Sequence, residues 1–174
     1  CDVSINSLHL ADTDIGYFDS RARLNPPLRQ QGDRDALSAA LADGTIDALV
    51  SDHTPVEADA KTLPFAEAEA GATGLELLLP LALLWSERSG AGIARAIEVV
   101  TSAPARLLAA ADAGTGIGRL VEGGVADLCI VDPALEWQVR PEALKSQGKH
   151  TPFAGYPMQG RARHTLVAGR VVHG

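Results

Sequence analysis

The chain has 174 residues and a net charge of −7, and 46% of its residues are hydrophobic. This apolar content is enough for a packed core and argues against an intrinsically disordered chain. The acidic balance argues against a nucleic-acid partner, because an acidic surface repels phosphate backbones. No apolar run reaches the roughly 18 residues that a membrane-spanning helix needs, so we expect no membrane partner.

The start of the chain, CDVSI, is typical of a short strand and carries neither an initiator Met nor a signal peptide. We therefore expect a cytoplasmic protein and a piece of a longer chain, with a processed N-terminus as the alternative. The two cysteines are too few for a disulfide framework. We expect Cys1 to be a cut end and Cys129 to be a buried strand residue, rather than nucleophiles.

The next segments predict one helix and one buried strand. Asn25-Pro26-Pro27 fixes an extended loop within residues 16–31, because proline excludes regular structure there. A helix is expected from Asp33 to a C-terminal cap at Gly44. The apolar run 45–51 then predicts a parallel strand that is buried on both faces.

A polar loop is expected over residues 52–72, and helices follow it. Apolar residues at spacings of three and four predict a helix over 73–88, with a bend at Pro80. A second helix is expected over 93–100, and a short one is expected from Pro104 to Leu108.

Helical periodicity ends near residue 113, where glycines become frequent. Strands are predicted over 128–131 and over 165–172, the latter as a hairpin that turns at Ala168-Gly169. The glycine-rich run 114–118 superficially resembles a phosphate loop, but it neither follows a strand nor opens a helix. The order of elements predicts an α/β protein with a parallel sheet and a β-rich last third.

Asp52 and His53 are the first candidate for chemistry, because they follow the clearest strand directly. Catalytic residues of parallel α/β folds gather at the carboxyl ends of strands. Asp52 could bind a metal ion or act as a general base, with His53 nearby. The alternative is that Asp52 only caps a turn.

Histidines alone do not complete a metal site in this sequence. A catalytic zinc needs about three protein ligands and an open position. The five histidines form neither an H-x-H pair nor an i, i+4 pair. They are His9, His53, His150, His164 and His173. We expect the last two to be surface residues of the terminal hairpin.

Asn25 and Arg29 are the second candidate, because the two prolines between them would hold both side chains at fixed positions. The Asn amide could pair with an amide substrate, and the Arg could bind a carboxylate through two hydrogen bonds. The alternative is a rigid connecting loop with a surface arginine.

The order of several short motifs carries a family resemblance. These motifs are NPPLR (25–29), SDHTP (51–55), GLE (74–76), PAR (104–106), GVADL (124–128) and KHTPF (149–153). In this order the chain resembles the C-terminal half of a dihydroorotase of the amidohydrolase superfamily, over essentially its whole length. NPPLR with a downstream Asp-His-x-Pro is specific to dihydroorotases, whereas the Ala-Asp-Leu stretch alone would indicate only the superfamily.

The resemblance implies a fold and a reaction. Residues 1–112 would form the last strands and helices of a partial TIM-type (β/α) barrel, and residues 113–174 the C-terminal part of a small β-sandwich domain. The reaction interconverts N-carbamoyl-aspartate and dihydroorotate in pyrimidine biosynthesis. By the resemblance Asp52 would bind zinc and act as the general base, and Asn25 would contact the substrate. Arg29 and His53 are further substrate-binding candidates.

Two substitutions depart from the family pattern. Val56 stands where the family has the second histidine of Asp-His-Ala-Pro-His, and Asn6-Ser7 stand where it has two histidines after a proline. The family's other metal ligands precede the residues that this chain contains. Of the metal shell only Asp52 is present, so we expect no cofactor in this chain, although catalytic members of the family hold zinc.

The departures predict a vestigial site and a structural role. Non-catalytic members of this family hold aspartate transcarbamoylase in an assembly, and we expect the same partner here. An active zinc-dependent dihydroorotase is the alternative, and an unrelated α/β binding module is a third hypothesis. Because two barrel strands leave open edges, we also expect a homo-oligomer or a missing N-terminal half to cover them.

Overall fold

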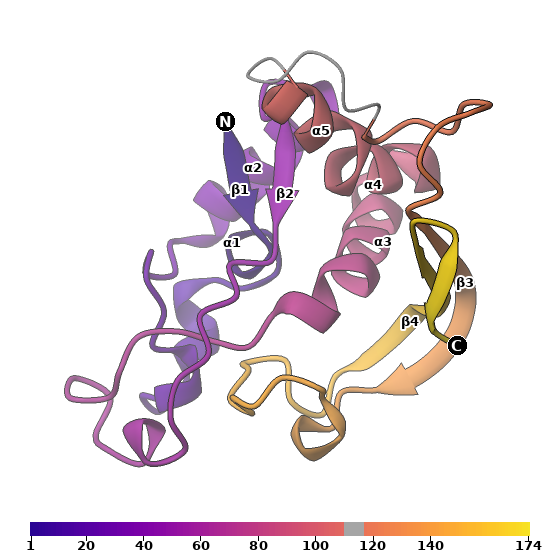
Figure 1. Cartoon of the computed structure of the whole chain (residues 1–174). Coiled ribbons are helices and arrows are strands. Elements are labelled where there is room, and N and C mark those ends of the chain that lie inside the picture. Colours follow the sequence, from indigo (N-terminus) through magenta and orange to yellow (C-terminus); the bar gives the residue numbers. More distant parts are fainter. Residues whose placement is uncertain (110–116) are drawn as a thin grey trace.

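The computed structural model describes residues 1–109 and 117–174. Its helices and strands are β1 (Asp2–Ser4), α1 (Ile5–His9), α2 (Gln31–Asp43), β2 (Ala48–Val50), α3 (Leu78–Ser89), α4 (Gly92–Val100), α5 (Ser102–Ala109), β3 (Leu128–Gln138), β4 (Pro157–Val167) and β5 (Arg170–His173). Figure 1 shows α3 and α4 between the β1–β2 pair on one side and the strands β3–β5 on the other. The fold is mixed α/β, as the sequence predicts.

β1 and β2 form a parallel pair in which Ser4 lies opposite Val50. Helices α1 and α2 connect the two strands, so the carboxyl ends of both strands meet at one edge. Ala48 and Leu49 are 3% and 2% exposed, which confirms that the second strand is buried. β2 is shorter than the predicted strand, because the Ile46 amide donates to the Ala40 carbonyl at the end of α2 instead of to a strand.

Sequence signals place the ends of α2, α4 and α5 within two residues, whereas α3 begins five residues after the expected start at residue 73. Gly44 caps α2 with a φ of 88°, a left-handed conformation that glycine adopts without strain. Asp33 lies inside the first turn of α2, where its carboxylate accepts from the Gln30 amide. The helix expected over 73–88 opens with a 3-10 turn at Leu75–Leu77. Pro80 is the third residue of α3, so it lies where an amide would have no intrahelical partner and marks the start of the helix.

The last third of the chain forms an antiparallel sheet in the order β3-β4-β5. The hairpin between β4 and β5 turns at Ala168 and Gly169, which have φ angles of 48° and 78°, and this confirms the predicted turn. β3 extends beyond the predicted strand 128–131, with register shifts between Ile130 and Val131 and between Asp132 and Glu136. Such irregularities let the strand accommodate Pro133, which has no amide hydrogen to donate.

Cys129 corrects one prediction. It is a free and exposed cysteine on β3, not a buried one. The apolar run around it predicts burial, but much of this part of the sheet is open to solvent, and the neighbouring Ile130 is 52% exposed. His164 and His173 are exposed on the same sheet, which confirms their expected surface position.

The buried core draws residues from both parts of the chain. Ile5 of α1 and Leu81 and Trp85 of α3 share one cluster with Val139 and Phe153, which lie in the connection between β3 and β4. The predicted boundary at residues 112 and 113 lies outside the described residues. Within the described residues, no helix is both long enough and apolar enough to span a bilayer.

Candidate functional site

The candidate site lies at the carboxyl ends of β1 and β2. Ser4 is the last residue of β1, and Asp52 follows β2 by two residues. The Ser4 hydroxyl donates to Oδ2 of Asp52 over 2.9 Å. Ser4 Oγ also accepts from the Asn6 amide at 3.1 Å, which caps α1. Asp52 itself has a φ of 49°, so its backbone adopts the left-handed conformation.

His53 lies next to Asp52 and binds the segment that leads into α3. Its Nδ1 accepts from the amides of Gly74 and Leu75 at 3.2 and 3.3 Å. Because Nδ1 uses its lone pair for these bonds, the ring proton of the neutral imidazole lies on Nε2. A Cβ at position 74 would lie 2.4 Å from the Ser51 carbonyl oxygen, so only glycine allows this close approach.

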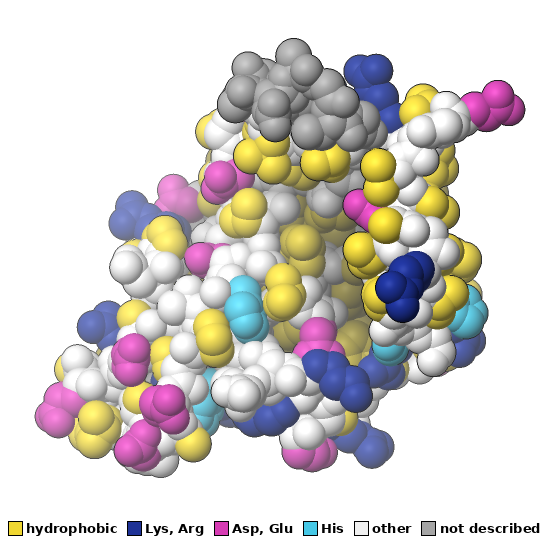
Figure 2. Space-filling view, in the orientation of Figure 1, with side chains coloured by type: hydrophobic (Ala, Val, Ile, Leu, Met, Phe, Trp, Pro, Cys, Tyr) yellow, Lys and Arg dark blue, Asp and Glu magenta, His cyan; other side chains and the backbone are white. Residues whose placement is uncertain are grey.

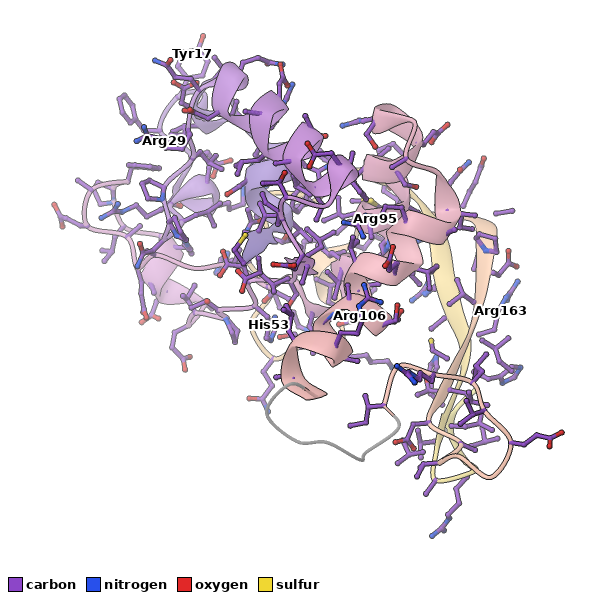
Figure 3. The ribbon with its side chains drawn as sticks, turned by 90° about the horizontal axis from the view of Figure 1, so that it is seen from above. Tyr17, Arg29, His53, Arg95, Arg106 and Arg163 are labelled. Carbon is purple, nitrogen blue, oxygen red and sulfur yellow. The ribbon has the colours of Figure 1, made fainter. Side chains whose placement is uncertain are left out.

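Asn25 and Arg29 are on an exposed loop, as expected for the two prolines between them. Arg29 pairs with Asp33 at 3.5 Å, one helical turn further on, and its side chain is 72% exposed. Figure 3 shows Arg29 and His53 on well-separated parts of the molecule. The structure therefore brings Asp52 and His53 together with Ser4, but not with Arg29, and a substrate-binding role of Asn25 and Arg29 stays a prediction.

The three residues that were predicted to depart from the family pattern lie at least partly inside the protein. Asn6 is 5% exposed, Val56 is 6% exposed, and Ser7 is half-buried. The Val56 side chain packs against Gly71, where an added Cβ would lie 3.0 Å from Val56 Cγ1. An apolar side chain at position 56 can neither donate a hydrogen bond nor bind a metal ion, so this position serves packing.

The residues of this chain do not fit a catalytic metal ion by themselves. Among the described residues, no group of three His, Cys, Asp or Glu side chains is placed to hold one. At the site Asp52 supplies one carboxylate, which Ser4 already contacts, and His53 directs its Nδ1 lone pair at backbone amides. A catalytic zinc needs about three protein ligands, which this arrangement does not provide.

Comparison with known proteins identifies the family. The Amidohydrolase family model matches residues 2–173. The chain belongs to the amidohydrolase family. The curated dihydroorotases of Geobacter sp. (strain M21) and Trichlorobacter lovleyi are 39% and 38% identical to it over 173 and 172 residues. These matches cover 99% of this chain but 40% and 39% of the two relatives, so the chain spans about two fifths of their length. The predicted resemblance to dihydroorotases is confirmed.

Solved structures of the family have the same fold as this amidohydrolase chain. L-hydantoinase from Arthrobacter aurescens superposes with a TM-score of 0.88 at 30% identity, over 99% of this chain and 39% of that one. D-hydantoinase from Thermus sp. gives a TM-score of 0.87 at 24% identity, over 99% and 38% of the two chains, and so shows the fold alone.

Sequence analysis missed one member of the site, Ser4. The residue lies 48 positions before its partner Asp52, and nothing in the local pattern of CDVSI marks its hydroxyl. The usable signal is topological: a polar residue at the end of one parallel strand lies beside a polar residue at the end of its neighbour.

Proposed function

We propose that this chain belongs to a dihydroorotase-like protein of pyrimidine biosynthesis that does not itself catalyse the dihydroorotase reaction. It acts in the cytoplasm as a structural partner of aspartate transcarbamoylase. Its residues 1–112 contribute the last strands and helices of a partial TIM-type barrel, and residues 113–174 contribute part of a β-sandwich. The parallel β1–β2 pair with its helical connection supports the barrel, and the curated dihydroorotases at 39% identity support the pathway.

The composition of the site carries the proposal of inactivity. The carboxylate of Asp52 is held by Ser4, and the positions that the family fills with histidines at this edge carry Asn6, Ser7 and Val56. Upstream residues could not restore these positions, because the side chains at 6, 7 and 56 belong to this chain. Asp52 therefore serves as a structural acceptor between two strands.

An active zinc-dependent dihydroorotase is the second candidate. One observation favours it: Asp52 and His53 stand at the carboxyl end of a buried parallel strand, where catalytic groups of such folds gather. This candidate requires the remainder of the protein to supply all other ligands. Zinc bound by the full-length protein through Asp52 would support it.

The exposed apolar surface supports a structural role. A cavity of about 710 Å³ lies between α3 and the strands β3 and β4, and its lining includes Leu83, Leu84, Trp137 and Met158. Figure 2 shows further hydrophobic side chains on both sides of the hollow between the helices and the β-sheet. Surface of this kind is normally covered by another part of the protein, by a second copy or by a partner. The sequence predicts a candidate for each: the N-terminal half of the protein, a second copy in a homo-oligomer, and the transcarbamoylase.

The structural role is tested by assembly in solution. The full-length protein is mixed with aspartate transcarbamoylase of the same organism, and the mass of the product is measured by sedimentation. We expect a stable complex, and we expect Asp52→Asn to form it equally well, because assembly does not use the carboxylate charge. Separate sedimentation of the two proteins would refute the partnership.

A further inference from the structure

Two loops that are distant in sequence form an aromatic projection at the edge of the molecule. Tyr17 is 104% exposed and Phe18 is 73% exposed. The rings of Phe18 and Phe65 meet edge to face, with their centroids 5.9 Å apart. We call Tyr17, Phe18 and Phe65 the aromatic tip, and Figure 3 shows Tyr17 at the periphery of the molecule. Large aromatic side chains are frequent anchors of protein–protein interfaces, so a tip of this kind is typical of an interaction surface.

The surrounding contacts hold the aromatic tip in a fixed shape. Phe18 has a φ of 59°, a left-handed conformation that a residue with a side chain adopts only where its surroundings enforce it. On the inner side, the guanidinium carbon of Arg23 lies 5.6 Å from the centre of the Phe65 ring. Lys61 Nζ donates to the carbonyl oxygens of Ser20 and Arg23, which joins the second loop to the first. Because the tip is already ordered, it loses little conformational entropy when a partner binds it.

The surroundings of the aromatic tip are acidic. Residues 12–23 and 57–71 contain seven acidic and three basic residues, so these two segments carry four of the seven net negative charges of the chain. Arg21 pairs with Asp19 at 2.6 Å and Lys61 is 5% exposed, which leaves little positive charge on this surface. Figure 2 shows acidic side chains beside hydrophobic ones in this part of the molecule, at the lower left. Five exposed acidic residues form no ion pair within the described part of the chain: Asp12, Glu57, Asp59, Glu67 and Glu69.

We propose that the aromatic tip is the surface through which the protein docks on aspartate transcarbamoylase, an inference that rests on the partnership proposed above. The acidic surroundings define the receiving surface: an apolar pocket for Tyr17 and Phe18, edged by lysine or arginine side chains. The same charges disfavour two other occupants. A second copy in a two-fold contact would place two acidic surfaces against each other, and an anionic membrane would repel the tip.

Calorimetric titration of the full-length protein with aspartate transcarbamoylase of the same organism tests the role of the ring. Tyr17→Ser should leave the fold unchanged, because the side chain is fully exposed. It should weaken binding by at least about 10-fold, the loss that is typical of an interface anchor. Leu120→Ser is the matched control and should change the affinity by less than about 2-fold. Leu120 is 85% exposed and belongs to the segment before β3, at the opposite end of the molecule in Figure 1.

A charge reversal tests the acidic surroundings. Glu67 is exposed and lies two residues after Phe65. Glu67→Lys should weaken the complex by about 3- to 10-fold at low salt, and the difference from the unchanged protein should shrink as the salt concentration rises, because exposed charges are screened. Glu122→Lys makes the same change in charge on the exposed segment before β3 and should leave the affinity unchanged.

The possible outcomes separate this inference from the partnership itself. A complex that Tyr17→Ser leaves at its original affinity would refute the aromatic tip as the docking surface, while the partnership stands. Separate sedimentation of the unchanged proteins would refute both. Thermal unfolding of the free full-length protein gives the remaining check. If Tyr17→Ser lowers the Tm by several degrees and Leu120→Ser does not, another part of the same protein covers the tip, and the proposal is overturned.

Discussion

The Ser4 hydroxyl donates to Oδ2 of Asp52 at 2.9 Å and so joins the carboxyl ends of two parallel strands. The same hydroxyl oxygen caps α1 through the Asn6 amide. One side chain therefore connects a strand end, a helix start and the carboxylate of Asp52, which the sequence predicts as a metal ligand or general base.

Ser4→Ala should destabilise the protein by about 1–2 kcal/mol, because it removes both a helix cap and the donor to a partly buried carboxylate. Urea unfolding monitored by circular dichroism measures the loss. Ser7→Ala, in the same short helix, is the control and should stay within about 0.5 kcal/mol of the original protein. Equal stability of the two variants would mean that the Ser4 bonds contribute nothing.

His9 should make the folded state sensitive to mild acid. Its folded pKa of about 4 lies below the ordinary value of 6.5, so the unfolded chain binds the proton more readily. The neutral ring of His9 therefore contributes fully to the free energy of unfolding above pH 6.5, and this contribution is lost as the pH falls toward 4. Between pH 6.5 and 5 the free energy of unfolding should fall by about 1.5 kcal/mol. Urea titrations across this range measure it, and His9→Gln should remove most of the slope; an unchanged slope would assign the effect to other groups.

Lys61 connects two surface loops. It is 5% exposed, and its Nζ donates to the carbonyl oxygens of Ser20 and Arg23 at 3.0 and 2.8 Å. Lys61→Met leaves both oxygens without this donor and should cost about 2–3 kcal/mol. Chymotrypsin should then cleave faster near the exposed Tyr17 and Phe18.

The matched control for Lys61 is Lys145→Met. Lys145 is exposed, and its ammonium makes no hydrogen bond within the described residues. The control should digest at the original rate. Equal digestion of both variants would show that Lys61 does not hold the loops together.

The β4–β5 turn leaves room for a stabilising substitution. Ala168 has a φ of 48°, which strains a residue with an ordinary Cβ, whereas asparagine tolerates this conformation. Ala168→Asn should raise the free energy of unfolding by about 0.5–1 kcal/mol, as thermal and urea unfolding can measure. Gly169→Ala, with a φ of 78°, should act in the opposite direction. A destabilising Ala168→Asn would contradict the assigned turn.

Local chemistry explains which parts of the fold were predictable. Gly44 ends α2, and Ala168-Gly169 forms the turn of the β4–β5 hairpin. Both conformations depend on a few neighbouring residues, so the local sequence predicts them. The length of β4 was not predictable: its first four residues, Pro157 to Gly160, include a proline and a glycine, which strands disfavour, and pairing with β3 holds them in the sheet. Cys129 was assigned to the interior because its neighbours are apolar, but exposure depends on what packs against the sheet.

The same distinction holds for the candidate site. Asp52 and His53 are adjacent in sequence and follow an evident strand, so their place at the strand end was predictable. Their partners come from distant segments: Ser4 from the preceding strand, and Gly74 from the start of the next helix.

The most direct test of the proposed inactivity compares dihydroorotase turnover by the full-length protein and by Asp52→Asn, each assayed with added zinc. Asparagine keeps an acceptor for Ser4 and tolerates the φ of 49°, so the variant should fold normally. We predict that both proteins show only the background rate of the uncatalysed reaction. Turnover by the unchanged protein that exceeds the Asp52→Asn rate by about 100-fold or more, the contribution of a working general base, would contradict this account.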